Sequence, residues 1–187
     1  MNAALASPQL YQQMGVARRT PRAALMGFGP RSSTLNHQKA VQDAKEQGAL
    51  MEPGSVRASL YRLQEHIGRL PEAELPLIHT FAKGSYARSM FMPAGTALVG
   101  KIHKVQHITC LSQGEVSIFS ESGGSERMEG PRIWTTEPGT KRAIYAHTDA
   151  FLTTFHVTDL TDPDEIEDEL TTSTFEEVDR IIAGAKS

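Results

Sequence analysis

The chain of 187 residues has little cysteine and few aromatic side chains, with one Cys, one Trp and 6% aromatic residues. A single cysteine, Cys110, excludes an intrachain disulfide bond and is typical of a protein from a reducing compartment. Cys110 lies in an apolar run, so we expect a small core residue rather than a reactive thiol. Apolar residues make up only 39% of the chain, which suggests that part of it lies outside the core.

Long apolar runs are also missing. None approaches the roughly 18 residues of a membrane span, and the N-terminus lacks the basic start and apolar centre of a secretion signal. We therefore expect a soluble protein that is cytoplasmic on synthesis and has no membrane partner. The sequence contains neither a phosphate-binding loop nor a Gly-x-Ser-x-Gly nucleophile motif, which argues against the enzyme classes built on them.

The net charge of −3 conceals an asymmetry along the chain. Residues 1–50 carry six Lys/Arg against two Asp/Glu, or +4, and the remainder carries 13 against 20, or −7. A basic arm on an acidic body can dock on an acidic partner, on nucleic acid or on another copy, and a solvated tail is the alternative. Its arginines are sparse and its aromatics few, so we do not expect a nucleic-acid partner.

Three segments are expected from these patterns. Residues 1–54 form an extended basic arm, without periodicity up to residue 33, followed by a short helix over 34–47. Residues 55–158 form an amphipathic helix and a β-barrel. The helix over 55–70 can begin at Ser55 and has an apolar stripe that packs on the barrel or on another copy; its members are Val56, Leu60, Leu63, Ile67 and Leu70.

Residues 159–187 form an acidic helical tail. Ten Asp/Glu and no Lys or Arg occur between positions 159 and 179. One helix is expected to start at Asp162-Pro163 and a last one after Ser173, to about Ile182. We expect a solvated cap, or a segment that pairs with the basic arm of a neighbouring copy.

Between residues 77 and 157, β-rich runs alternate with Gly/Pro turns, mostly every eight to twelve residues. This rhythm is typical of an all-β sandwich or barrel, and too few helices intervene for a parallel sheet. The sequence therefore predicts a mainly β protein with an antiparallel jelly-roll barrel. The expected strands are 77–81, 86–92, 96–103, 107–111, 115–120, 125–129, 132–136, 141–146 and 150–157.

Four histidines fall early and late in the barrel segment, where closure brings distant strands together. They are the candidate ligands of one divalent transition metal, because imidazole is the commonest protein ligand for such ions. The alternative is a set of polar side chains in a barrel mouth that bond to one another or to water. The four are His103, His107, His147 and His156.

Residues 92–157 resemble the cupin family of small jelly-roll barrels. The run Gly95…His103…His107…Gly114 is similar to the first cupin motif, a Gly, a His-x-His pair, a Glu and a Gly turn. The turn Pro138-Gly139-Thr140 and the strand after it resemble the second motif, which carries a His and an Asn.

This sequence departs from both motifs. Lys101 replaces the first His, His107 stands at the Glu position, and Arg142 and Ala146 replace the His and Asn of the second motif. The resemblance therefore implies His103 and His107 as ligands, with His156 as a better third than His147. Positive charge in the barrel implies an anionic ligand, held by Lys101, Arg142 or Tyr145.

The sequence also resembles cupin-like proteins encoded by bacteriophages, which implies a virion role. The leading hypothesis is then a non-enzymatic assembly protein, a homo-oligomer that docks on other virion proteins through residues 1–50 and the helix 55–70. A metal-dependent dioxygenase or isomerase for a small anionic or polar molecule is the alternative, and a ligand-binding barrel without chemistry is a third.

Overall fold

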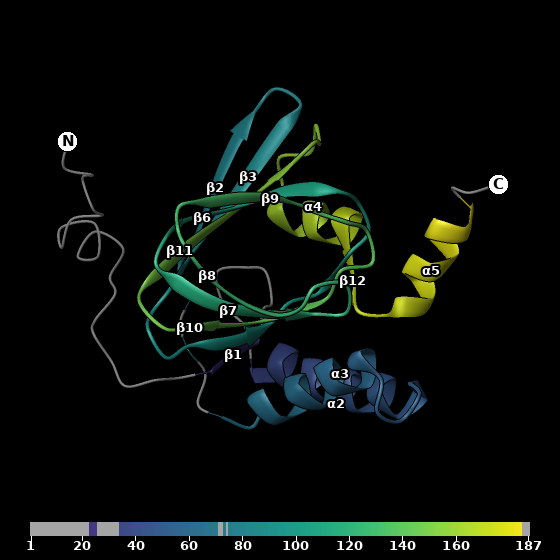
Figure 1. Cartoon of the computed structure of the whole chain (residues 1–187). Coiled ribbons are helices and arrows are strands. Elements are labelled where there is room, and N and C mark those ends of the chain that lie inside the picture. Colours follow the sequence, from purple (N-terminus) through teal and green to yellow (C-terminus); the bar gives the residue numbers. More distant parts are fainter. Residues whose placement is uncertain (1–22, 26–33, 71–72, 74, 185–187) are drawn as a thin grey trace.

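The computed structural model describes residues 23–25, 34–70, 73 and 75–184, and two five-stranded sheets face each other in it (Figure 1). The first sheet has the order β1 (Ala23–Leu25), β4 (Ala97–Val99), β10 (Arg142–Ala146), β7 (Glu115–Ser120), β8 (Gly124–Glu129). The second has the order β2 (Leu77–Ala82), β3 (Ser85–Met92), β11 (Ala150–His156), β6 (His107–Gln113), β9 (Arg132–Thr136). All neighbours are antiparallel except β1 and β4. The predicted jelly-roll barrel is confirmed.

Side-chain alternation along the strands builds the core between the two sheets. Every second residue points inward, and many of these residues are apolar, which is the pattern of strands with one buried face. The turn between β6 and β7 needs glycine, because Gly114 has φ of 90° and a Cβ there would lie 2.3 Å from the carbonyl oxygen of Asp149. The inward residues include Met92, Leu98, Leu111, Val116 and Leu152.

Two strand predictions need correction. The strand expected over 96–103 is interrupted after Val99, and the chain continues as β5 (Ile102–His103). Gly100 still donates to the carbonyl of Arg142, but β5 leaves the sheet and pairs with β12 (Thr171–Thr172). In the first 33 residues of the arm, where no element was expected, Ala23–Leu25 forms β1 beside β4.

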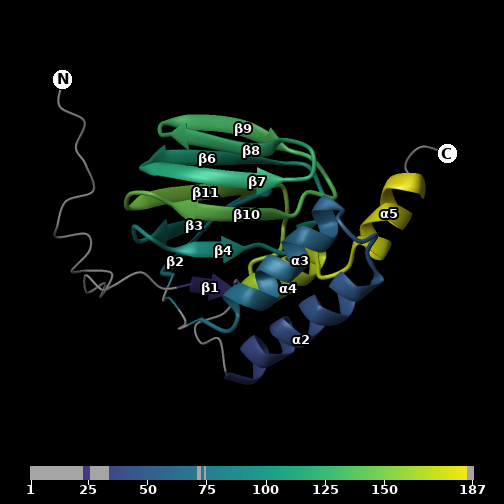
Figure 2. The ribbon, with the colours of Figure 1, turned by 60° about the horizontal axis from the view of Figure 1, so that its bottom comes forward.

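Helices α2 (Thr34–Leu50) and α3 (Val56–Ile67) lie beside the first sheet (Figure 2). Ser55 begins α3 as predicted, and its Oγ accepts from the Ala58 amide at 3.1 Å. The predicted stripe is only partly right, because Leu63 and Leu70 are exposed and Tyr61 is buried instead. Leu60 packs with Ile67 against the outer face of the sheet, at Val99 and Ala143. None of the helices in the described ranges is long and apolar enough to cross a membrane.

The acidic tail is part of the folded body rather than a solvated cap. Helix α4 (Pro163–Leu170) begins after Asp162, whose carboxylate accepts from two amides of the first turn. Its Ile166 packs on Tyr86 of β3, which closes one end of the barrel. Helix α5 (Phe175–Gly184) packs through Phe175 on Tyr61 of α3. The acidic side chains outnumber the apolar ones here, but the apolar ones fall on the buried faces.

Candidate metal centre

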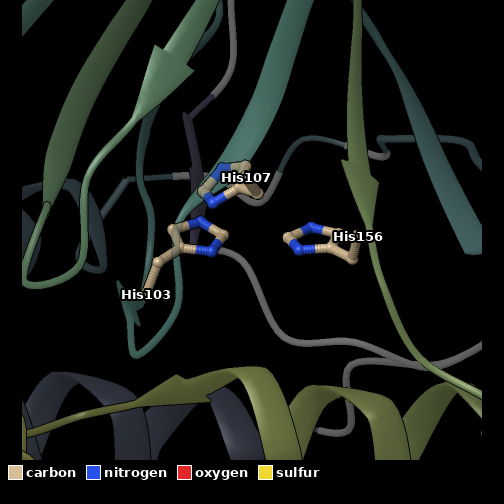
Figure 3. A group of neighbouring side chains, drawn as sticks. All are labelled: His103, His107 and His156. Carbon is tan, nitrogen blue, oxygen red and sulfur yellow. The ribbon is translucent and has the colours of Figure 1, made fainter.

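Three of the four candidate histidines come together near one end of the barrel (Figure 3). His103 comes from β5, His107 begins β6 and His156 ends β11. One ring nitrogen of each lies within 4.8 Å of those of the other two. The ring centroids of His103 and His107 are 4.1 Å apart, and those of His107 and His156 are 4.6 Å apart.

The topology explains this convergence. Strands β6 and β11 are neighbours in the second sheet, and Ile108 pairs with Phe155, so the next residues inward, His107 and His156, meet at the end of the barrel. His103 lies on β5, which follows β4 of the first sheet along the chain and pairs with β12 instead of with that sheet. The triad therefore depends on the C-terminal segment as well as on the barrel.

The triad leaves polar atoms without hydrogen-bond partners. His107 Nδ1 lies 3.3 Å from the carbonyl of Val105, so it carries the proton and leaves the Nε2 lone pair bare. Within the described part of the chain, that Nε2 atom, His103 Nδ1 and His156 Nδ1 are all buried and have no partner. A buried unpaired polar group costs about 1–3 kcal/mol. Three such atoms, on rings that each bring one nitrogen within 4.8 Å of the other two, fit a bound divalent transition ion.

The protonation of the rings suits this role. Burial lowers the pKa of His107 to about 4. Burial, with repulsion from His107 and Arg88, lowers the pKa of His156 to about 3. Burial and the neighbouring positive charges also hold the pKa of His103 well below its usual value. At neutral pH all three imidazoles are uncharged, which is the form that binds metal ions.

A cavity of about 50 Å³ lies in the barrel, and His103 is the member of the triad that lines it. Two arginines line it, and burial lowers the pKa of each to about 10, so both remain charged at neutral pH. The guanidinium of Arg142 donates to Thr136 Oγ1 at 2.6 Å and lies 5.8 Å from the centre of the Trp134 ring. A cavity lined by guanidinium groups suits an anionic ligand. Its polar lining comprises Arg88, Lys101, His103, Thr109, Thr140, Arg142 and Thr154.

A carboxylate from the acidic tail balances this positive charge. Glu167 of α4 is 6% exposed, pairs with Lys101 and interacts electrostatically with Arg88. Burial raises the pKa of Glu167, and its pairing with Lys101 opposes that rise. The sequence predicted positive charge in the barrel from Lys101 and Arg142, and the structure places the carboxylate of Glu167 beside Lys101.

The other two candidate residues lie apart from the triad. His147 Nε2 bonds to Ser117 Oγ at 2.7 Å, which satisfies it without a metal. Tyr145 is 44% exposed and points out of β10, with its ring 5.0 Å from that of His147. The alternation of β10 explains this, because Arg142 and Ile144 face the cavity and Tyr145 faces the opposite side.

Sequence reasoning missed Arg88 and Glu167. Arg88 carried a signal, since Tyr86, Arg88 and Met90 alternate along one predicted strand and must share its inner face. Glu167 carried no such signal in the sequence, because it is one of ten acidic residues in the tail. Only the tertiary fold shows that Glu167, and not another of them, lies beside Lys101.

Replacing Glu167 with Gln is expected to weaken the binding of a divalent ion roughly tenfold, which equals about 1.4 kcal/mol. The substitution leaves the charges of Lys101 and Arg88 unbalanced beside the triad. The measurement is a Zn²⁺ competition titration. Glu177→Gln is the matched control, since Glu177 also pairs with a lysine, Lys104, but its side chain is 42% exposed against 7% for Glu167. Equal affinities for both variants would contradict this role of Glu167.

No protein-family model and no curated protein matches the chain. Solved structures with a similar fold include ectoine synthase from P. lautus, with a TM-score of 0.43 and 15% identity over 53% of this chain and 77% of that one. A RmlC-like cupin family protein from Methanocaldococcus jannaschii has a TM-score of 0.40 and 9% identity over 50% and 86%. An acetylacetone dioxygenase from Acinetobacter johnsonii has a TM-score of 0.36 and 16% identity over 44% and 58%.

These similarities assign no activity to this chain. By its own sheet order and core, the protein is a jelly-roll barrel with elements added on both sides of the barrel segment. Its candidate site is a buried triad of imidazoles beside a cationic cavity.

Proposed function

We propose that the protein is a metal-dependent enzyme that acts on a small anionic molecule. The observation that carries this proposal is the triad of buried imidazole nitrogens, His103 Nδ1, His107 Nε2 and His156 Nδ1, which lack partners among the described residues. Structural histidines normally satisfy their ring nitrogens, as His147 does with Ser117. Three protein ligands leave coordination positions open, as catalytic metal sites require.

The residues that line the cavity would bind the small anionic molecule. A bound divalent ion would supply Lewis-acid activation of an oxygen on the molecule next to it. Arg142, fixed by Thr136 and Trp134, presents its guanidinium to a carboxylate, and Arg88 adds a second positive charge. Apolar side chains such as Leu98 and Leu152 form the remaining wall and limit the entry of water.

The assembly hypothesis finds less support. It depended on the arm, and residues 1–22 and 26–33 lie outside the described residues. It also depended on a degenerate metal motif, whereas the fold joins the two motif histidines with His156 from outside the motif. Neither the fold nor the similar structures give evidence for a virion role, so it does not enter the proposal.

A cobalt titration tests both parts of the proposal, the binding of a metal ion and the binding of a small anion. Protein freed of metal by a chelator should bind one equivalent of Co²⁺ and develop visible absorption bands. Malonate should then shift those bands. A protein that binds well under one equivalent overturns the metal-dependent function, and a protein that binds Co²⁺ but is indifferent to small carboxylates overturns the anionic substrate.

Replacing Arg142 with Met should weaken malonate binding to the Co²⁺ protein at least tenfold, because charged hydrogen bonds contribute about 1.5–3 kcal/mol each. Metal affinity should stay equal or rise, since one positive charge near the triad is lost. Spectrophotometric titrations give both constants. The control is Arg127→Met, which removes an arginine that pairs with Glu115 on the barrel surface. If Arg127→Met weakened malonate binding as much as Arg142→Met, the cavity would not be the anion site.

A further inference from the structure

The outer face of the second sheet carries no charged residue. On each strand, every second side chain points away from the barrel, and the strand pairings align these residues in rows. One row runs Ile78–Ser89–Thr153–Cys110–Ile133, and the next runs Thr80–Ala87–Phe155–Ile108–Thr135. Charged residues make up 22% of the whole chain. We call the whole outer face of this sheet, with these two rows at its centre, the uncharged sheet face.

Large apolar side chains on this face are exposed. Ile133 is 72% exposed, Ile108 49% and Phe155 45%, and they come from three adjacent strands, β9, β6 and β11. The predicted core position of Cys110 is wrong, because its side chain points outward between Thr153 and Ile133 and is partly exposed. Isolated exposed apolar residues are common, but a contiguous apolar patch marks an interaction site.

The first sheet shows the contrast. Its outer face carries α3 on Val99 and Ala143, and further along β7 and β8 it carries the ion pair of Glu115 with Arg127. A helix and charged side chains therefore occupy the outer face of the first sheet. Among the described elements, no helix packs on the uncharged sheet face.

We propose that the occupant of this face is the same face of a second copy, in a twofold-symmetric dimer. An uncharged surface is complementary to itself, because a twofold axis brings no like charges together and leaves none unpaired. A partner with a charged surface would lose hydration of its charges here without gaining a counter-charge. This proposal names the interface of the homo-oligomer that the sequence predicted.

The size of the face is sufficient for a stable dimer. Five strands about 4.8 Å apart and about seven residues long, at about 3.3 Å per residue, cover roughly 550 Å². Two such faces remove about 1,100 Å² from water, which exceeds the roughly 1,000 Å² expected of a biological interface. The metal centre lies on the inner side of the same sheet, so the interface leaves the cavity unobstructed.

Light scattering on the full chain tests the dimer. The wild-type protein should have twice the chain mass of 20.5 kDa. Ile133→Lys and Ile108→Lys should each give the monomer mass at the same concentration, because a buried unpaired ammonium group is strongly unfavourable. Leu50→Lys, at a position on α2 that is 75% exposed, should stay dimeric. A monomeric wild type overturns the proposal, and so does an oligomer that survives both substitutions on the face.

Cys110 gives an independent measurement that does not require a variant. As the only cysteine of the chain, it reports directly on the centre of the face. Its reaction rate with a thiol reagent should fall at least tenfold as the protein concentration rises through the dimerisation range. A rate that is independent of protein concentration would place the contact elsewhere and overturn the proposal.

Discussion

Replacing His156 with Leu should stabilise the metal-free protein by about 1 kcal/mol and abolish its stabilisation by metal. The gain arises because the substitution removes a buried ring nitrogen that has no partner among the described residues, and such an atom costs about 1–3 kcal/mol. The loss arises because a metal that binds only the folded state stabilises it in proportion to its affinity. Urea unfolding with a chelator, and then with Zn²⁺, measures both effects.

His147→Leu is the matched control for this experiment. Its ring bonds to Ser117, so the variant should lose about 1 kcal/mol without metal and keep the full increment with Zn²⁺. The two substitutions therefore have opposite signs in the metal-free protein. If His156→Leu destabilised that protein as His147→Leu does, the triad would be an ordinary structural cluster.

Replacing Lys141 with Met should raise stability at pH 7 and remove a strong pH dependence. Burial lowers the pKa of Lys141 to about 7, and Lys101 adds repulsion. Its Nζ donates to the carbonyl of Gly100 at 2.8 Å and lies 5.0 Å from the centre of the Tyr61 ring. These contacts do not fully replace the hydration of an ammonium group.

The sign follows from proton binding. Between pH 7 and 10.5 the unfolded chain keeps a proton on Lys141 that the folded protein has released, so wild-type stability rises with pH in this window. Below pH 7 both states are protonated and the full cost of burial remains. From pH 7 to 9.5 the wild type should gain about 3 kcal/mol relative to Lys141→Met. Lys83→Met, at an exposed position, should run parallel to the wild type. Parallel curves for Lys141→Met as well would contradict the shift.

The barrel was predictable because its signals are local. Alternating apolar residues and Gly/Pro turns specify strand positions and the buried face, and both survive in the fold. The break between β4 and β5 was not predictable, because the 96–103 run has strand character throughout. Its interruption depends on pairing with Thr171, about seventy residues away. The same tertiary dependence explains why the apolar stripe of α3 was misassigned at Leu63.

The residues of the candidate site were likewise predictable only in part. His103 and His107 followed from the family resemblance, and His156 followed from strand adjacency in a jelly roll. Tyr145 was assigned to the cavity together with Arg142. The two residues are an odd number of positions apart on one strand, so their side chains lie on opposite faces of the sheet. Glu167 could not be selected, because its role depends on how α4 packs against the barrel end.

The central claim is that His103, His107 and His156 bind one divalent transition ion. The most direct test is elemental analysis of the full-length protein purified without chelator, with the protein concentration measured on the same sample. The account predicts one equivalent of metal per chain, lost in His156→Leu and retained in His147→Leu. A wild-type protein that carries no metal and takes up none on titration with Zn²⁺ or Co²⁺ would contradict it.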